Sequence, residues 1–209
     1  ISALVNDEAY IRDLHEGFGV PAADARDYAF GGCSETLIPG RTNVDSTWVA
    51  YNTLDILNAC MYRNCVRCAD FEAFLQCFKD DLQRTARELR DHIAARQMPM
   101  GVFLPDPLCT LHFDGCIQSG RSYQAGGAQY NFENANIYGW TNVLNALWAL
   151  RACYRGELGI GRAGFVAALK DNFAHAPALL ARIRKLPKFG NGDAELSAFA
   201  ADLTRFLFE

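Results

Sequence analysis

Hydrophobic residues recur at helical intervals through the middle of the chain. The series is Phe74, Phe78, Leu82, Thr85, Leu89 and Ile93, whose members lie three or four residues apart. An α-helix turns once every 3.6 residues, so this spacing gathers these side chains on one face. Charged residues fill the positions between them. The pattern predicts a long amphipathic helix over residues 74–93.

Several other segments combine apolar residues with helix start and stop signals. Asn6 can cap a first helix, Pro21 can open a second, and the glycines between them separate the two. The expected helices cover residues 6–17, 22–28, 48–63, 141–154, 162–174, 177–186 and 194–207. Residues 97–107 hold three prolines and a glycine, which predicts a connection and not a helix.

Strand signals are few. Residues 108–113 are apolar and bounded by turns, which fits a short helix or a buried strand, and residues 126–132 fit a glycine-led strand or loop. So few strands cannot pair into a full sheet by themselves. Long helices separated by short buried segments indicate a helix-rich α/β arrangement that is part of something larger.

Composition excludes several classes of function. Of the 209 residues, 50% are hydrophobic and 21% are charged, as in ordinary globular proteins. The net charge of −4 and the lack of a Lys/Arg cluster argue against a nucleic-acid partner. No apolar run is long enough for a membrane span, and the first residues do not resemble a secretory signal. We therefore expect a cytoplasmic protein, and the missing initiator Met suggests that Ile1 is not its natural start.

The chain contains eight cysteines. They are Cys33, Cys60, Cys65, Cys68, Cys77, Cys109, Cys116 and Cys153. Most have apolar neighbours, which favours buried free thiols over a disulfide framework. Cys65 and Cys68 have the spacing of a metal or redox pair, but no second pair follows at the interval of a zinc site, and we predict no metal site.

Cys33 lies in a loop with permissive backbone on both sides. Gly31-Gly32 precedes it and Pro39-Gly40 follows Glu35. If the loop is extended, Cys33 and Glu35 face the same side, because alternate residues of an extended chain do so. Three interpretations remain open for the thiol: a buried structural cysteine, a nucleophile that needs a histidine base, or a sulfur that takes up a hydrogen atom in radical chemistry.

Four blocks in a fixed order carry a family resemblance. The blocks are Asn6-Asp7-Glu8 with Ala25-Arg26-Asp27-Tyr28 and Gly32-Cys33-Ser34-Glu35; Pro39-Gly40-Arg41; Asp114–Arg121 with Gly126–Asn131; and Pro187–Asp193. Together they resemble the glycyl radical enzymes, which have a pyruvate formate-lyase-like domain. Several ordered blocks are more specific than a single motif.

The resemblance implies a fold. That fold is an α/β barrel of ten strands, of which this chain would supply roughly the second half, with the cysteine loop at residues 28–47 pointing into the centre. Residues 1–209 would then be the C-terminal part of the pyruvate formate-lyase-like domain. The family stores its radical on a glycine in an Arg-Val-x-Gly-Tyr motif, and this motif does not occur in the chain. We therefore expect no glycyl radical domain here and no activity from this chain alone.

The resemblance also implies roles for residues. Cys33 would carry a transient thiyl radical that takes a hydrogen atom from the substrate, and Glu35 would act as general base or acid. The Gly-Cys-x-Glu loop is similar to the branch that eliminates water, an amine or carbon dioxide. Substrate contacts are expected from Ser46 or Thr47. Asp45 either substitutes for them through a shifted loop or is a solvated turn aspartate. Tyr130 either lines the interior or belongs to a structural turn.

Partners and cofactors follow from the same resemblance. The substrate would be a small polar metabolite, and this chain would bind no cofactor directly. A glycyl radical on another segment would be installed by an activating enzyme that uses S-adenosylmethionine and an iron–sulfur cluster, and the full-length protein would form a homodimer. The alternatives are a non-catalytic scaffold that retains the helices, a formate acetyltransferase-type acyl transfer enzyme, and a thiolate enzyme with Cys33 as nucleophile.

Overall fold

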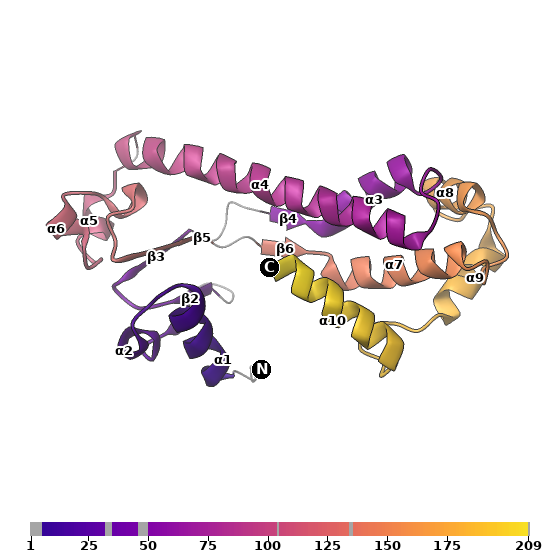
Figure 1. The fold of residues 1–209 in the computed structure, drawn as a ribbon. Coiled ribbons are helices and arrows are strands. Elements are labelled where there is room, and N and C mark those ends of the chain that lie inside the picture. The colour runs from indigo at the N-terminus through magenta and orange to yellow at the C-terminus, as the bar shows by residue number, and fades with distance from the viewer. Residues whose placement is uncertain (1–5, 32–34, 46–49, 104, 134–135, 209) are drawn as a thin grey trace. The chain divides into compact units, whose positions relative to one another are not determined.

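The computed structural model describes residues 6–31, 35–45, 50–103, 105–133 and 136–208 (Figure 1). The chain divides into two compact units. Unit 1 comprises residues 1–49 and 89–136, and unit 2 comprises residues 50–88 and 137–209. Cys33, Ser46 and Thr47 lie outside the described residues.

Unit 1 combines short helices with paired strands. Its helical elements are α1 (Asp7–Arg12), the π-helical turn η1 (Asp13–Gly17), α2 (Ala22–Ala25), α5 (Pro107–Thr110), α6 (Cys116–Ser119) and the 3-10 turn η2 (Tyr123–Ala125). Its strands are β1 (Ala29–Gly31), β2 (Glu35–Leu37), β3 (Thr42–Asp45) and β5 (Tyr130–Glu133). Strands β1 and β2 pair antiparallel, whereas β3 and β5 pair parallel.

A small hydrophobic core holds unit 1 together. Leu14, Val20, Ala25 and Ile38 are buried in one cluster, and the half-buried rings of Tyr28, Tyr130 and Phe132 pack against it. Ile38 directly follows β2, and it is almost fully buried. Burying a side chain of this size contributes roughly 1.5–3 kcal/mol. The core therefore fixes the strand that follows the Cys33 segment.

Unit 2 is helical apart from one short strand pair. Its elements are β4 (Ala50–Asn52), α3 (Thr53–Asn64), β6 (Asn136–Tyr138), α7 (Trp140–Tyr154), α8 (Arg162–Lys170), α9 (Pro177–Lys185) and α10 (Ala194–Phe208), and β4 pairs with β6. Asn52 caps α3 by accepting a hydrogen bond from the amide of Asp55. Helix α7 contributes many buried residues, among them Leu144 and Leu147.

The long helix α4 (Phe71–Phe103) contributes to both units. Phe74, Phe78 and Leu82 are buried in unit 2, as the apolar stripe predicts. The expectation of a connection over residues 97–107 is wrong in its first part, because the helix continues through Pro99 to Phe103. A proline inside a helix removes one hydrogen bond and crowds the preceding turn, which can kink a helix without ending it.

Two other sequence expectations need correction at their edges. The helix predicted over residues 48–63 begins only at Thr53, because residues 50–52 form β4, and Thr53 Oγ1 donates to the carbonyl of Tyr138 at 2.6 Å. The helix predicted over residues 22–28 ends at Ala25. The four C-terminal helices lie where the sequence places them, with α8 ending at Lys170.

The described cysteines are all free thiols. Cys60, Cys65, Cys116 and Cys153 are buried, whereas Cys109 is exposed. Within the described ranges, no group of three or more His, Cys, Asp or Glu side chains is placed to hold a metal ion. None of the helices in the described part of the chain combines the length and apolar character needed to cross a bilayer.

Candidate functional site

The predicted catalytic loop is framed by a hairpin. Ala29 pairs with Leu37, Phe30 with Thr36, and Gly31 with Glu35, so the strands meet on either side of residues 32–34. Glu35 is the first residue of β2 and is half-buried. A carboxylate on a hydrogen-bonded strand is held more firmly than one on a free loop, because the backbone pairing fixes its Cα.

Glycine at position 31 allows close packing beside this carboxylate. A Cβ added there would lie 2.5 Å from Leu37 Cδ2, so a larger residue would displace the Leu37 side chain. Tyr28, Phe30 and Tyr10 form an aromatic group on the approach to the loop, with ring centroids 5.1–5.5 Å apart. The Tyr28 hydroxyl donates a hydrogen bond to Asp7, which joins the first resemblance block to the hairpin.

A tight turn connects the hairpin to β3. The amides of Arg41 and Thr42 both donate to the Ile38 carbonyl at 3.0 Å, and the Ile38 amide donates to Thr42 Oγ1 at 3.0 Å. Gly40 has φ +73°, a value that glycine adopts without strain. The Pro39-Gly40-Arg41 block thus reverses the chain and delivers Arg41 to a polar network.

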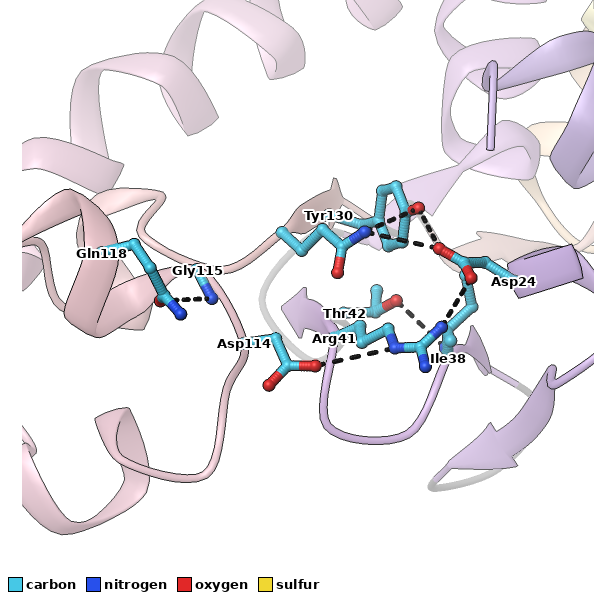
Figure 2. A network of polar contacts seen from close by, with 9 residues as sticks. Asp24, Ile38, Arg41, Thr42, Asp114, Gly115, Gln118 and Tyr130 are labelled. Atoms are coloured by element: carbon cyan, nitrogen blue, oxygen red, sulfur yellow. Dashed lines mark hydrogen bonds and ion pairs between the residues drawn. The ribbon is translucent and has the colours of Figure 1, made fainter. Parts of the chain in front are cut away.

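Asp24 is the centre of that network (Figure 2). Its carboxylate accepts from Arg41 Nη1 at 2.7 Å and from the Tyr130 hydroxyl at 2.6 Å. Gln129 Nε2 donates to the Tyr130 hydroxyl at 3.0 Å and lies 3.4 Å from Asp24. The hydrogen bond to Asp24 raises the pKa of Tyr130 above its ordinary value. The network joins α2, the turn before β3, and β5.

The third resemblance block packs onto the same turn. The Asp114 amide donates to the Gly40 carbonyl at 2.7 Å, and Asp114 Oδ2 lies 3.6 Å from Arg41 Nε. The Gln129 amide donates to the Asp114 carbonyl at 2.8 Å. Gly127 is confined, since an added Cβ would lie 2.2 Å from the Arg121 carbonyl oxygen. Residues far apart in the sequence therefore support one strand pair, β3–β5.

The fourth block belongs to unit 2. Lys188 Nζ donates to the carbonyls of Ile183 and Leu186 at 2.9 and 2.8 Å, and burial lowers its pKa. The Phe189 amide donates to Asn145 Oδ1 at 2.8 Å, which fastens the block to α7. These contacts hold the block in place, and they give the lysine and the backbone turn at these positions a structural role.

The structure describes two of the five predicted site residues. Glu35 starts β2, and Tyr130 starts β5 with its hydroxyl hydrogen-bonded to Asp24. Cys33, Ser46 and Thr47 fall outside the described residues. Sequence reasoning missed Asp24, because an aspartate in a short helix belongs to no motif. Its nearest signal was its position directly before the Ala25–Tyr28 block.

Comparison with known proteins gives a consistent result. The family model described as pyruvate formate lyase-like matches residues 1–209. The chain is 24% identical to the probable dehydratase YbiW of Escherichia coli, over 95% of this chain and 27% of that protein. It is 26% identical to the trans-4-hydroxy-L-proline dehydratase of Clostridioides difficile, over 91% of this chain and 26% of that protein.

A solved structure matches the fold over nearly the whole chain. The B12-independent glycerol dehydratase from Clostridium butyricum superposes with a TM-score of 0.88 at 24% identity, covering 99% of this chain and 28% of that one. The prediction of a helix-rich part of an α/β barrel is thereby confirmed. The resemblance to glycyl radical enzymes is confirmed as well. The chain spans about a quarter of the length of the relatives it matches.

Proposed function

Because this chain belongs to the pyruvate formate lyase-like family, we propose that it carries the catalytic cysteine and the acid–base glutamate of a glycyl radical lyase. Cys33 is the hydrogen-atom carrier and Glu35 handles protons. The pairing of Gly31 with Glu35 carries this assignment most strongly. It fixes the backbone of Glu35 two residues from Cys33 in the sequence. A protein that served only as a scaffold would not require a thiol and a carboxylate at this spacing.

In the proposed reaction, Cys33 transfers a hydrogen atom and Glu35 transfers a proton. A glycyl radical on a segment outside these residues, made by an activating enzyme that uses S-adenosylmethionine and an iron–sulfur cluster, supplies the unpaired electron. Cys33 gives its S–H hydrogen atom to that radical, and the resulting sulfur radical takes a hydrogen atom from a substrate carbon that bears a hydroxyl or amino group. The O–H or N–H group on the resulting carbon radical is more acidic than that of an ordinary alcohol or amine, so the Glu35 carboxylate accepts its proton.

Elimination follows from that proton transfer. Glu35 passes the proton to the hydroxyl on the adjacent carbon, which departs as water. The product radical takes the hydrogen atom back from Cys33, leaving a carbonyl compound or an imine and restoring the sulfur radical. Burial raises the pKa of a carboxyl, which helps one group accept and donate in turn. Water is the preferred leaving group because the relatives are named as dehydratases; an amine or carbon dioxide is the alternative.

Substrate contacts are proposed at Ser46 and Thr47, which follow β3 in the sequence. Strand β3 lies beside β5, so the Asp24 network fixes the backbone from which these residues extend. The Tyr130 hydroxyl donates to Asp24 and accepts from Gln129. Its first role in our proposal is thus to support β3–β5, and contact with substrate comes second. The substrate is a small polar compound with a hydroxyl group on one carbon and a hydroxyl or amino group on the adjacent, hydrogen-bearing carbon. The homodimer predicted for the full-length protein is retained as part of the proposal.

The test uses the complete polypeptide that contains these residues, activated without oxygen by its activating enzyme. Glycerol, propane-1,2-diol and trans-4-hydroxyproline are incubated with it, and the carbonyl or cyclic imine product is measured. We expect turnover of at least one compound, and its loss in Cys33→Ala and in Cys33→Ser, whose O–H bond is too strong for a carbon radical to break. Cys109→Ser is the matched control, because Cys109 is exposed and remote in sequence from the loop.

Two results would overturn the proposal. One is full turnover by Cys33→Ala, which would show that the reaction does not require this sulfur. The other is rapid alkylation of Cys33 near neutral pH together with radical-independent turnover, which would identify a thiolate nucleophile.

A further inference from the structure

Two thiols face each other at the connection between α3 and α4. Cys68 Sγ lies 3.9 Å from Cys77 Sγ, and both side chains are partly exposed. Cys68 belongs to the turn after α3, where its amide donates to the Asn64 carbonyl at 2.9 Å. Cys77 lies in the second turn of α4. We propose that Cys68 and Cys77 form a redox modification site that closes to a reversible intramolecular disulfide.

The neighbouring thiols have other surroundings. Cys60 is buried and accepts a hydrogen bond from Asn64 Nδ2 at 3.5 Å. Cys153 is buried and donates to the Ile160 carbonyl at 3.6 Å. Cys65 is buried, and burial raises its pKa to about 11. The C-x-x-C spacing of Cys65 and Cys68 is therefore misleading, because the contact made by the Cys68 sulfur is with Cys77.

Metal binding does not explain the pair. A structural zinc ion takes four ligands in a tetrahedron. Two sulfurs supply half of them, and the described residues hold no group of three or more potential ligands. Two thiols in van der Waals contact with no third ligand are instead suited to a covalent bond between them.

The local backbone favours closure. Cys77 is fixed between the buried residues Phe74 and Phe78 on α4. Cys68 lies in a turn, so rotation of its side chain can bring the sulfurs from 3.9 Å to a bonding distance of about 2.05 Å. Arg162 donates a hydrogen bond to the Cys68 carbonyl, which keeps this turn against the helices during the change.

The reaction is a pair of thiol–disulfide exchanges with a low-molecular-weight disulfide as oxidant. One protein thiolate attacks the reagent, forming a mixed disulfide and releasing one reagent thiolate. The second protein thiolate attacks the mixed disulfide and releases the other reagent thiolate. Two protein thiols thus lose two electrons and two protons, and one reagent disulfide becomes two thiols. Burial raises the pKa of Cys68, so the exchange is faster in mildly alkaline solution.

The experiment exploits a convenient arrangement of cleavage sites. The folded chain is treated with oxidised glutathione at about pH 8.5, free thiols are blocked with N-ethylmaleimide, and the protein is unfolded and digested with trypsin. Trypsin cuts after Arg67 and Lys79, so residues 68–79 form one peptide that contains Cys68, Cys77 and no other cysteine. We expect this peptide to lack two hydrogens and to carry no adduct. A second cut after Glu72 should leave its two parts joined until dithiothreitol is added.

Matched variants identify the partners. In Cys77→Ser, Cys68 should end as a glutathione adduct, and in Cys68→Ser the same should hold for Cys77. Cys109, which is exposed in unit 1, should carry glutathione or N-ethylmaleimide throughout. Three outcomes overturn the proposal: a 68–79 peptide with two adducts, a cross-link from Cys68 to the 64–67 peptide that holds Cys65, or an equal yield of the disulfide from urea-unfolded protein. This test is independent of the proposed enzymatic function.

Discussion

Glu35 lies directly opposite Gly31 in the antiparallel pair of β1 and β2. The carboxylate is thus anchored at the point where the chain leaves the hairpin for residues 32–34. Catalysis by an acid–base group held in this way should depend both on the charge of its side chain and on the length of that side chain. Replacement of Glu35 by Gln keeps the shape and removes proton transfer, whereas replacement by Asp keeps proton transfer and withdraws the carboxylate by one methylene.

We predict that Glu35→Gln lowers turnover by the activated full-length enzyme about 10²–10⁴-fold, the usual contribution of general acid–base catalysis. Glu35→Asp should retain more activity than Glu35→Gln. Measurement of kcat and KM for both variants checks the prediction, with circular dichroism as the control for folding. Equal and small effects of the two substitutions would indicate that the carboxylate does not transfer protons.

Asp24 should be a major polar contributor to the stability of unit 1. Its carboxylate accepts from Arg41 and Tyr130, and its side chain is only 21% exposed. Asp24→Asn replaces one acceptor oxygen by a donor and removes the charge. We expect the free energy of unfolding to fall by about 1–3 kcal/mol in urea titrations. Asp13→Asn is the control, because Asp13 pairs with Arg12 at 66% exposure and should cost less than about 1 kcal/mol. Similar losses in both variants would contradict this role.

Tyr51 should contribute to alkaline unfolding. Its hydroxyl donates to the Leu82 carbonyl at 2.6 Å, and burial raises its pKa from 10.0 to about 12. A folded-state pKa above the unfolded value means that the folded state holds the proton more tightly. The resulting stabilisation is complete below pH 10.0 and is lost as the pH rises toward 12.

Tyr51→Phe tests that assignment. At neutral pH the variant should lose about 1 kcal/mol with its hydrogen bond. Between pH 10 and 12 its stability should fall less steeply than that of the unmodified chain, as followed by urea unfolding at a series of pH values. Tyr62→Phe, at an exposed tyrosine, should leave the slope unchanged. An unaltered slope in Tyr51→Phe would show that this phenol does not titrate in that window.

The residues of the apolar stripe on α4 should contribute unequally to the free energy of unfolding. Leu82 is 1% exposed, whereas Leu89, two turns later on the same stripe, is half-buried. Leu82→Ala should cost about 2–5 kcal/mol, as expected for a large-to-small change in a core, and Leu89→Ala should cost clearly less. Thermal or urea unfolding of the two variants provides the comparison. Equal costs would show that Leu89 is as tightly packed as Leu82.

Much of the helical structure was predictable because local periodicity controls it. The stripe of Phe74, Phe78 and Leu82 and the C-terminal helices follow directly from their spacing. The strands were harder. Strand β4 pairs with β6, which is far away in the sequence. The local pattern at residues 50–52 does not show that partner, and it predicted a helix. The helix through Pro99 was missed because a proline predicts a helix end from local sequence, although a helix can continue through one.

The candidate site was predictable only in part. Glu35 was found through its motif and a family resemblance. Asp24 was not, because its importance depends on Arg41 and Tyr130 reaching it from two other segments. Likewise, the contact between Cys68 and Cys77 joins the turn after α3 to α4 across nine residues of sequence, whereas the C-x-x-C spacing favoured Cys65.

The parallel pairing of β3 with β5 has a consequence for how the protein is made. Thr42–Asp45 pair with Tyr130–Glu133, so the ribosome must synthesise the whole of α4 before β3 has its partner. Closing so long a loop is entropically costly, and non-local pairs form late in folding. During synthesis, the segment that bears Cys33 therefore emerges well before the framework that supports it. A ribosome-bound chain that stops before residue 130 should leave Ile38 without the rings of Tyr130 and Phe132, and the hairpin should become resistant to proteases only when these two residues have left the exit tunnel.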